Sequence, residues 1–374
     1  MDAEVAIVGA GVVGCATALA LARREVRVVV LEAEPEPALA ASGTNSGILH
    51  TGFDSPPGVL ETDLILRSAA LTDRVLAALR VPVLRCGARL HPRDSTHDVV
   101  GALFANAQRN GVKVLLRSDG ALKVPGEAVT DPVAYTLALA LAAARHGAEL
   151  RTGFHVTAMR PDEHGVALES AEAEGVRARL VVNCAGLYAD TVARMAGDRS
   201  FVIHPRKGEF LVFEPPQGER LERILLPAPT ERSKGVLVFP TVDGKVIAGP
   251  TAVDQQDKHD WSVRPQAVDE LHRQATELWP ALEGAEPIAA YAGLRPAGHG
   301  VNYLIEPSRA CAALVNVAAI RSTGLTAALG IAEYVCGLAR QLGIALGSER
   351  PLEPGQAPKS KVPWWWRAAG YRSR

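Results

Sequence analysis

The stretch EVAIVGAGVVGCATALALARREVRVVVLE, Glu4–Glu32, decides the fold. Its apolar run Val5–Val8 predicts a strand, and Gly9–Gly14 predicts a tight turn that opens an alanine-rich helix. A second apolar run, Val26–Leu31, predicts a strand that ends in Glu32. A strand, a glycine turn, a helix and a second strand closing on an acid form the βαβ unit that binds the ADP half of a dinucleotide.

Each glycine of this turn has its own role in such a unit. Gly9 permits the turn, Gly11 lets the backbone approach a pyrophosphate, and Gly14 lets the helix pack closely on the strand. The helix N-terminus offers N–H groups and a positive dipole end to the phosphates, while the acid bonds the ribose hydroxyls. The cofactor contacts predicted from this stretch are Gly9, Gly11, Val12, Val13, Gly14, Glu32 and Ala33.

Length and composition bound the rest of the chain. At 374 residues, two packed domains are expected, and a formal charge of −1 gives no global field for nucleic acid or anionic lipid. Five scattered cysteines predict buried thiols in a reducing compartment, with neither a disulfide frame nor a metal site. No secretory leader or bilayer-spanning run is evident, so we expect a soluble, cytoplasmic protein.

The pattern along the chain predicts an α/β, overall α+β, architecture with two domains. Strand-into-glycine segments at 179–186 and 314–324 repeat the logic of the first unit. Short β runs between 204 and 307, with an Asp243-Gly244 turn, predict an antiparallel sheet. We expect a discontinuous Rossmann-like nucleotide domain (1–80, 130–200 and 308–346), a substrate domain (81–129 and 201–307) and a tail (347–374).

The remaining elements follow from hydrophobic periodicity and from turn residues. Helices are expected at 61–79, 99–110, 132–146, 189–196, 265–278 and 327–342. Strands are expected at 112–116, 149–159, 166–169, 179–184, 210–213, 236–239, 245–248 and 314–320.

Glu32 would suit a nicotinamide or a flavin dinucleotide, but three further features favour FAD. They are a glycine-bearing strand end at Asn183–Gly186, a glycine-rich segment at Ala41–Gly47, and a terminal helix opened by Gly324–Thr326. An extended, permanently held FAD needs that many backbone contacts, and a helix N-terminus can stabilise the reduced ring at its N1/O2 edge. A nicotinamide dehydrogenase stays the weaker alternative.

The chain resembles the D-amino-acid-oxidase-like FAD oxidoreductases, within them the branch of glycerol-3-phosphate dehydrogenases/oxidases and L-2-hydroxyglutarate dehydrogenases. The segments that carry the resemblance are NSGILHTGFDSPPG (45–58), NCAGLYADTVARMAG (183–197), HPRKGEF (204–210), KGVLVFPTVDGKVIAGPT (234–251), YAGLRP (291–296) and STGLTAALGIAEYV (322–335). The resemblance implies oxidation of a small anionic 2-hydroxy compound by hydride transfer to flavin N5. It also implies reoxidation of the flavin by quinone or O2.

The resemblance implies that His50, in the Asn45–Gly52 segment, takes the hydroxyl proton. In the alternative, His50 only hydrogen-bonds the cofactor loop. His204 and His299 are the runners-up because each is close in sequence to an arginine.

Arg295 is expected to hold the substrate's anionic group, since its planar fork suits carboxylate or phosphate. The alternative is an arginine paired with an acid of the sheet. Lys234 and Arg206 are weaker candidates for a second positive group, and Tyr291 either closes the pocket or packs in the core. Further cofactor contacts implied by the resemblance are Ser42, Thr44, Asn45, Ser46, Val156, Ala185, Gly186, Gly293, Arg295, Thr323, Gly324, Leu325 and Thr326.

One segment departs from the glycerol-3-phosphate dehydrogenases, some of which have an arginine shortly after the motif histidine. Here Phe53–Pro57 contains none, and Pro57 replaces the lysine that related proteins often have. Fewer positive charges put phosphate binding in doubt and leave room for a carboxylate. Oxidation of an amine or amino acid is the enzymatic alternative, and a non-catalytic flavin-binding assembly protein is the alternative from another class.

The tail has three consecutive tryptophans, Trp364–Trp366, with cations nearby. Tryptophan beside cations suits a membrane interface, where a flavin would be close to quinone. The alternative, a tail that packs on the protein itself or on a neighbouring subunit or is partly disordered, is favoured because the segment is short and has no amphipathic period.

Overall fold

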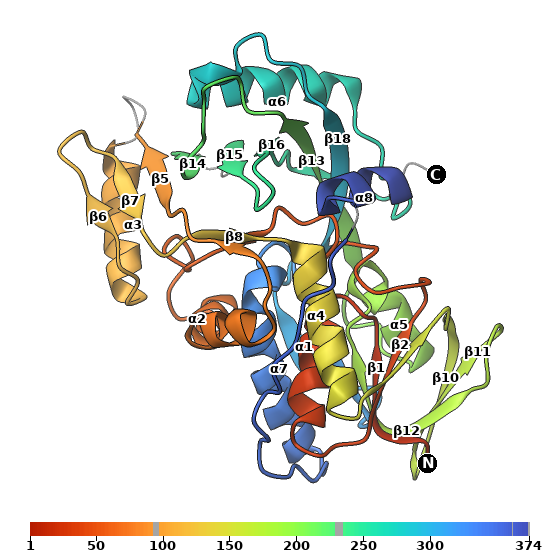
Figure 1. Cartoon of the computed structure of the whole chain (residues 1–374). Helices are drawn as coiled ribbons and strands as arrows, with labels where there is room; N and C mark the ends of the chain where they lie inside the picture. The colour runs from red at the N-terminus through yellow and green to blue at the C-terminus, as the bar shows by residue number, and fades with distance from the viewer. Residues whose placement is uncertain (93–96, 229–234, 361, 373–374) are drawn as a thin grey trace.

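The computed structural model describes residues 1–92, 97–228, 235–360 and 362–372. Two large sheets organise them, a mostly parallel sheet in the lower half of Figure 1 and a mixed sheet in the upper half. The small third sheet that contains β8 lies between the two (Figure 1).

The lower sheet is built around five parallel strands in the order β9-β2-β1-β12-β20, as in doubly wound nucleotide-binding folds. Antiparallel strands extend it at β12 and at β20. Its strands are β1 (Ala3–Val8), β2 (Val28–Glu32), β9 (Glu149–Thr152), β10 (Val156–Asp162), β11 (Gly165–Ser170), β12 (Val176–Asn183), β19 (Leu304–Pro307) and β20 (Leu314–Ala318).

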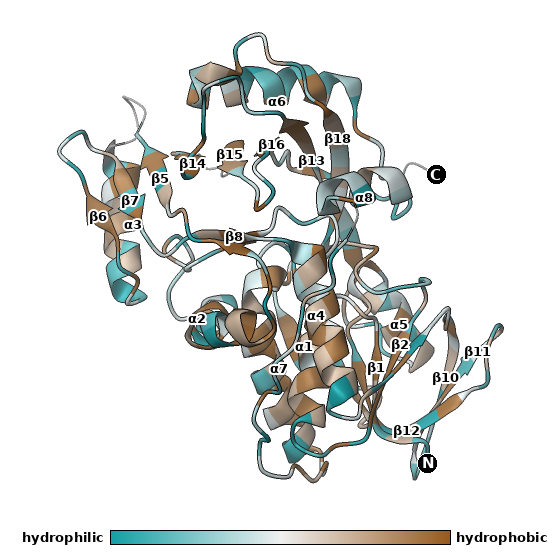
Figure 2. Ribbon diagram, viewed as in Figure 1, coloured by the Kyte–Doolittle hydropathy of each residue, from teal (hydrophilic) through white to brown (hydrophobic). Residues whose placement is uncertain are grey.

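Apolar helices cover both faces of this sheet, and the hydrophobic strands lie between them (Figure 2). Asp131 caps α4 (Pro132–Arg145), because its carboxylate accepts the N–H groups of Val133 and Ala134 at 2.9 Å. The helix ends before Gly147, whose φ of +98° cannot continue it. The helices are α1 (Val12–Ala22), α2 (Leu60–Ala78), α4 (Pro132–Arg145) and α7 (Gly324–Gln341) on one side, with η1 (Gly186–Tyr188) and α5 (Ala189–Met195) on the other.

The upper sheet is long and bent, and α6 (Pro265–Leu278) covers its outer face (Figure 1). Its longest strands, β13 (Ile203–Phe213) and β18 (Ala289–Gly298), pair antiparallel along almost their whole length. The others are β5 (Ala88–His91), β6 (Leu115–Leu116), β7 (Leu122–Val124), β14 (Ile224–Pro227), β15 (Leu237–Pro240), β16 (Val246–Gly249) and β17 (Val253–Asp254), with α3 (His97–Arg109) and η2 (Pro280–Leu282) nearby. The small third sheet has the order β3 (Ile48–Leu49), β8 (Ala128–Thr130), β4 (Val83–Leu84).

Most expected elements are present, and five expectations need correction, one of which is that the strand expected at 210–213 begins at Ile203, as β13. The strand expected at 149–159 is two strands, because Gly153 has a φ of +66° and turns the chain across the end of β2. The strand expected at 112–116 shrinks to β6, and the helix expected from 327 begins at Gly324. The upper sheet is mixed, because β14 pairs parallel with β5. The residue boundaries of the two domains stay a prediction.

The tail does not expose its tryptophans as a membrane anchor would require. It ends in α8 (Trp364–Arg372), in which Trp364 and Trp365 are 2% and 5% exposed. Trp364 packs edge-on against Tyr291 of β18, and Trp365 donates to Asp243 at 3.1 Å. Only Trp366, at 51% exposure, faces solvent, so the membrane interpretation of the three tryptophans gives way to the packing alternative.

This packing predicts a stability difference between neighbouring tryptophans. Trp364→Ala is expected to lower the free energy of unfolding by about 3 kcal/mol, because it leaves a cavity between α8 and β18. Trp366→Ala is the matched control and is expected to change it by less than about 0.5 kcal/mol. Denaturant titration of the two variants measures both values, and equal effects would contradict this docking of α8.

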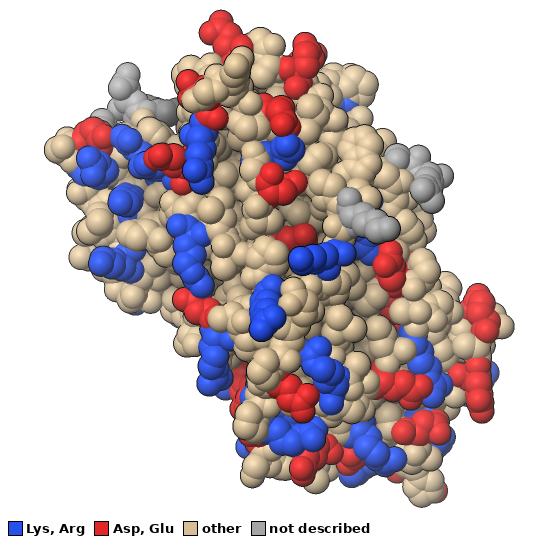
Figure 3. Space-filling view, viewed as in Figure 1, with Lys and Arg blue, Asp and Glu red and all other residues tan. Residues whose placement is uncertain are grey.

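Surface and cysteine chemistry agree with the composition. Lys, Arg, Asp and Glu are interspersed over the face shown in Figure 3, as a formal charge of −1 leads one to expect. All five cysteines are described and free, and four of them are buried. Within the described ranges, no helix combines the length and apolar character that crossing a bilayer requires.

Candidate active site

The glycine turn before α1 has no room for side chains at two of its three positions. Gly9 has a φ of +102°, and a Cβ there would lie 2.5 Å from the carbonyl oxygen of Cys184. A Cβ on Gly14 would lie 2.0 Å from the carbonyl oxygen of Gly9. Gly9 therefore packs the turn directly against the end of β12, and Gly14 packs the start of α1 against the turn.

The groups around this turn fit the phosphate and ribose parts of a dinucleotide. Gly11 caps α1, and the next N–H, of Val12, meets the Ser42 hydroxyl at 2.9 Å. The Glu32 carboxylate at the end of β2 accepts the N–H groups of Ala10 (2.6 Å) and Glu34 (3.0 Å). A bare helix N-terminus, a hydroxyl and an acid at the second strand are the donor and acceptor set that such a cofactor needs.

Gly11→Ala tests this cradle without disturbing the fold. Its Cβ would meet only the Ser42 hydroxyl, at 3.1 Å, but it would stand where a pyrophosphate approaches the backbone. We expect the Kd for FAD to rise about tenfold, or about 1.4 kcal/mol, as measured by quenching of flavin fluorescence. Gly337→Ala in α7, with nothing within 4 Å, is the control. Unchanged affinity in Gly11→Ala would place the cofactor elsewhere.

The other predicted cofactor residues gather along the carboxyl edge of the parallel sheet. A Cβ on Gly293 of β18 would lie 2.7 Å from the carbonyl oxygen of Thr44, so the upper sheet touches the Ala41–Gly47 segment there. A Cβ on Gly324 would lie 4.0 Å from Val13, so α7 begins beside the start of α1. At the other end, the N–H of Phe154 donates to the Glu32 carbonyl at 2.8 Å, which places the start of β10 beside Glu32.

The remaining residues that we expect to contact the cofactor lie in turns, at the start of a strand or at the start of a helix. Asn45 accepts the N–H of Gly47 at 2.9 Å, and Ser46 accepts the N–H of Ile48 at 3.3 Å. Thr323 caps α7. The others lie at the start of β10 (Val156), in the turn after β12 (Ala185, Gly186) and in the first turn of α7 (Leu325, Thr326).

His50 forms a pair with a buried acid. It follows β3, and its backbone N–H donates to the Thr326 hydroxyl in the first turn of α7 at 3.0 Å. Its Nδ1 lies 3.0 Å from Oε2 of Glu127. The Glu127 side chain is fully buried, whereas 27% of the His50 side chain is exposed. The histidine is thus fixed by its backbone and by one ring nitrogen.

Sequence reasoning missed Glu127. In the small sheet, Ile48 pairs with Val129 and Leu49 with Ala128, so the next pair in this antiparallel register is His50 with Glu127. The two residues are 77 apart in sequence, and no local pattern joins them. Only the register of a two-residue strand could have revealed the contact.

Arg295 lies on the face of β18 that is turned toward the glycine-rich segment Ala41–Gly47. It is opposite Arg206 in the β13–β18 register, two residues beyond Gly293, and alternate residues of a strand share a face. The guanidinium crosses Gly208, where a Cβ would lie 2.9 Å from Arg295 Nη2. Arg295 donates to the carbonyl oxygens of Arg206 (3.2 Å), Lys207 (3.2 Å) and Thr251 (2.6 Å).

The charge of Arg295 is not neutralised by an acid. Among the described residues it forms no ion pair, whereas neighbouring Arg206 is held by Asp254 at 2.7 Å. Burial, together with the charges of Arg206 and Arg321, lowers the pKa of Arg295 to about 10, while Asp254 acts in the opposite direction, so Arg295 remains cationic at neutral pH. A partly buried cation without a carboxylate partner among the described residues favours the anion-anchor interpretation over pairing within the sheet.

The structure favours a packing role for Tyr291. Its ring stacks on Phe210 at 4.8 Å and contacts Trp364, and it is 2% exposed. Its hydroxyl has no hydrogen-bond partner among the described residues, and burial raises its pKa. Lys234 lies outside the described residues.

The two runner-up histidines form a separate group at the far end of β13 and β18. The rings of His204 and His299 lie 6.5 Å apart. His204 also lies 3.6 Å from Asp254. Neither has a described contact with His50 or Glu127.

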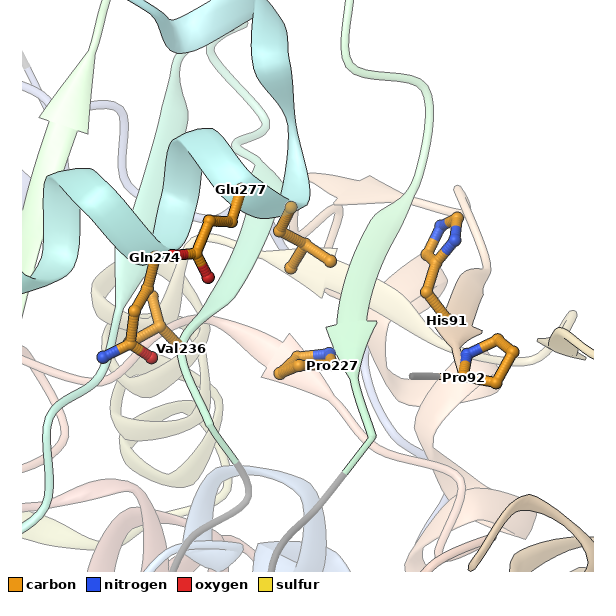
Figure 4. A pocket seen from close by; sticks show the side chains of 7 residues that line it. His91, Pro92, Pro227, Val236, Gln274 and Glu277 are labelled. Atoms are coloured by element: carbon orange, nitrogen blue, oxygen red, sulfur yellow. The ribbon is translucent and has the colours of Figure 1, made fainter. Parts of the chain in front are cut away.

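A cavity of about 210 Å³ lies elsewhere, between α6 and the ends of β5 and β14. In Figure 4, Gln274 and Glu277 reach it from α6, and His91 lies beyond Pro227. Burial lowers the pKa of His91. None of the predicted site residues that the structure describes lines this cavity.

Two relatives with different named substrates are similar to much of this chain. A glycerol 3-phosphate dehydrogenase of Caloramator mitchellensis is 28% identical over 94% of this chain and 76% of its own length. A mitochondrial L-2-hydroxyglutarate dehydrogenase of Nematostella vectensis is 29% identical over 67% of this chain, which spans 62% of that protein.

A solved structure matches the fold over nearly the whole length of both chains. It is L-α-glycerophosphate oxidase from Mycoplasma pneumoniae, dithionite-reduced and with FAD bound, with a TM-score of 0.87, 24% identity and coverage of 96% and 99%. The family model for FAD-dependent oxidoreductases of the DAO type matches residues 4–338. The chain therefore belongs to the DAO family of FAD-dependent oxidoreductases.

Proposed function

We propose that this enzyme oxidises a small 2-hydroxy compound with an anionic group, of the glycerol 3-phosphate or L-2-hydroxyglutarate type. One observation carries the proposal. The His50–Glu127 pair and Arg295, which has no acid partner among the described residues, both lie close to segments expected to hold the cofactor. His50 is held on α7, and Arg295 is two residues from the Gly293–Thr44 contact. Relatives named for both substrate types support the same class.

In this proposal Arg295 holds the anionic group and thereby orients the carbon that bears the hydroxyl. His50 accepts the hydroxyl proton as the carbonyl forms. FAD, when bound, supplies the acceptor for the hydrogen and the bonding electron pair that leave this carbon. Quinone or O2 as the final acceptor and a cytoplasmic location belong to the same proposal, and the free cysteines support a reducing compartment.

Anaerobic bleaching of the flavin band by a substrate panel tests the proposal. The panel is glycerol 3-phosphate, L-2-hydroxyglutarate, lactate, malate, glycine, sarcosine and D-amino acids. We expect at least one 2-hydroxy anion to reduce the flavin. Reduction by the amines alone would identify an amine oxidase, and reduction by no member would favour a non-catalytic flavin protein.

A further inference from the structure

We propose that Glu127 is a positioning residue that fixes the tautomer of His50, so that Nε2 is the atom that accepts the substrate's hydroxyl proton. The inference rests on the proposed function of this site. Glu127 acts through His50, and no contact of Glu127 with substrate or cofactor is implied.

The hydrogen bonds at Glu127 define which atoms carry protons. Oε1 accepts the Thr51 N–H at 2.7 Å and the Thr51 hydroxyl at 2.9 Å. Oε2 lies 3.0 Å from His50 Nδ1. A carboxylate only accepts hydrogen bonds, so Nδ1 carries the proton and the lone pair of the neutral ring is on Nε2.

The burial of the carboxylate makes this arrangement specific. Glu127 is 1% exposed, and a buried charge needs hydrogen-bond partners for each oxygen. The charge of Glu127 also acts on the thiol of Cys86. Burial raises the pKa of that thiol, and Glu127 adds to the shift. A neutral thiol leaves the negative charge of Glu127 directed at His50, where it stabilises the imidazolium formed when Nε2 takes a proton.

Glu127→Gln is expected to move the ring proton of His50 from Nδ1 to Nε2. The two Thr51 donors require an acceptor at the Oε1 position, so the amide oxygen must lie there. The amide NH2 then faces His50 Nδ1 and donates to it, which moves the ring proton to Nε2. A ring protonated at Nε2 cannot accept the hydroxyl proton there. Glu127→Asp keeps a carboxylate and therefore keeps the proton on Nδ1.

The experiment combines tautomer assignment with rapid kinetics on the FAD-loaded protein. Histidine is labelled with ¹⁵N, and the His50 signals are assigned by their loss in His50→Gln. We expect Nδ1–H in the wild type and in Glu127→Asp, and Nε2–H in Glu127→Gln. Flavin reduction at saturating substrate is expected to slow about tenfold or more in Glu127→Gln, with partial recovery in Glu127→Asp.

Glu209→Gln is the matched control, because it changes another fully buried carboxylate, paired with Arg264, to an amide. It is expected to leave the His50 tautomer as it is. An unchanged tautomer or an unchanged rate in Glu127→Gln overturns the proposal. If no hydroxy anion reduces the wild type, the proposed function fails, whereas the tautomer comparison still decides the role of Glu127.

Discussion

Replacing His50 by alanine is expected to slow flavin reduction by a 2-hydroxy anion about 10²- to 10⁴-fold, because a positioned general base contributes that factor. The ring is held at Nδ1 by Glu127, and its backbone by Thr326, so the variant removes the proton acceptor and leaves the backbone contact. Anaerobic stopped-flow mixing of the FAD-loaded variant with substrate measures the rate.

Two controls separate this role from the alternatives. His204→Ala removes the runner-up histidine, which lies beside Asp254 and His299. This variant is expected to reduce the flavin at a rate within about twofold of the wild type. FAD affinity, measured by fluorescence, is expected to stay the same in His50→Ala. A variant that loses FAD but reduces normally once reloaded would show that His50 only supports the cofactor loop.

Arg295→Ala is expected to weaken reduction by the same substrate about 10- to 100-fold, because one charge-assisted anchor typically contributes a few kcal/mol. The loss is expected mainly in KM, since the anionic group is held before and during reaction. The initial rate of flavin bleaching over a range of substrate concentrations separates the two parameters.

The control for Arg295 must account for its three backbone acceptors. Arg295→Lys keeps the charge without the planar fork, and Arg206→Ala removes a neighbouring guanidinium that Asp254 already holds. We expect Lys to recover part of the affinity and Arg206→Ala to have a much smaller effect. Equal losses in Arg206→Ala and Arg295→Ala would remove the special role of Arg295.

The βαβ unit could be predicted because everything that specifies it is local. The observed β1, α1 and β2 differ from the expected ranges by about two residues at their ends, since apolar runs and glycines mark them directly. The α6 boundaries, Pro265–Leu278, were predicted without error because a proline opens that helix.

The features that the sequence did not reveal are non-local. The His50–Glu127 contact depends on the pairing of β3 with β8. The lack of an acid partner for Arg295 depends on which carbonyl groups and acids the neighbouring strands bring beside β18. Hydrophobic periodicity says which face of a strand is buried, but it does not say which strand will lie next to it.

For Tyr291 and the tail, too, the sequence does not show which residues pack against each other. An aromatic residue in a strand suits a pocket wall or a core equally well, and the docking of Trp364 on Tyr291 decides between them. Three consecutive tryptophans beside cations are typical of a membrane surface, but two of them are buried against other parts of the same chain.

The central claim is that this FAD enzyme removes hydrogen from the carbinol carbon of a small hydroxy anion. The most direct measurement is anaerobic bleaching of the flavin band by L-2-hydroxyglutarate or glycerol 3-phosphate, with hydrogen or deuterium on that carbon. The account predicts that at least one of the two bleaches the band, and that its deuterated form does so more slowly. A band that neither these two compounds nor any other 2-hydroxy anion of the panel bleaches, at any concentration up to saturation, would contradict it.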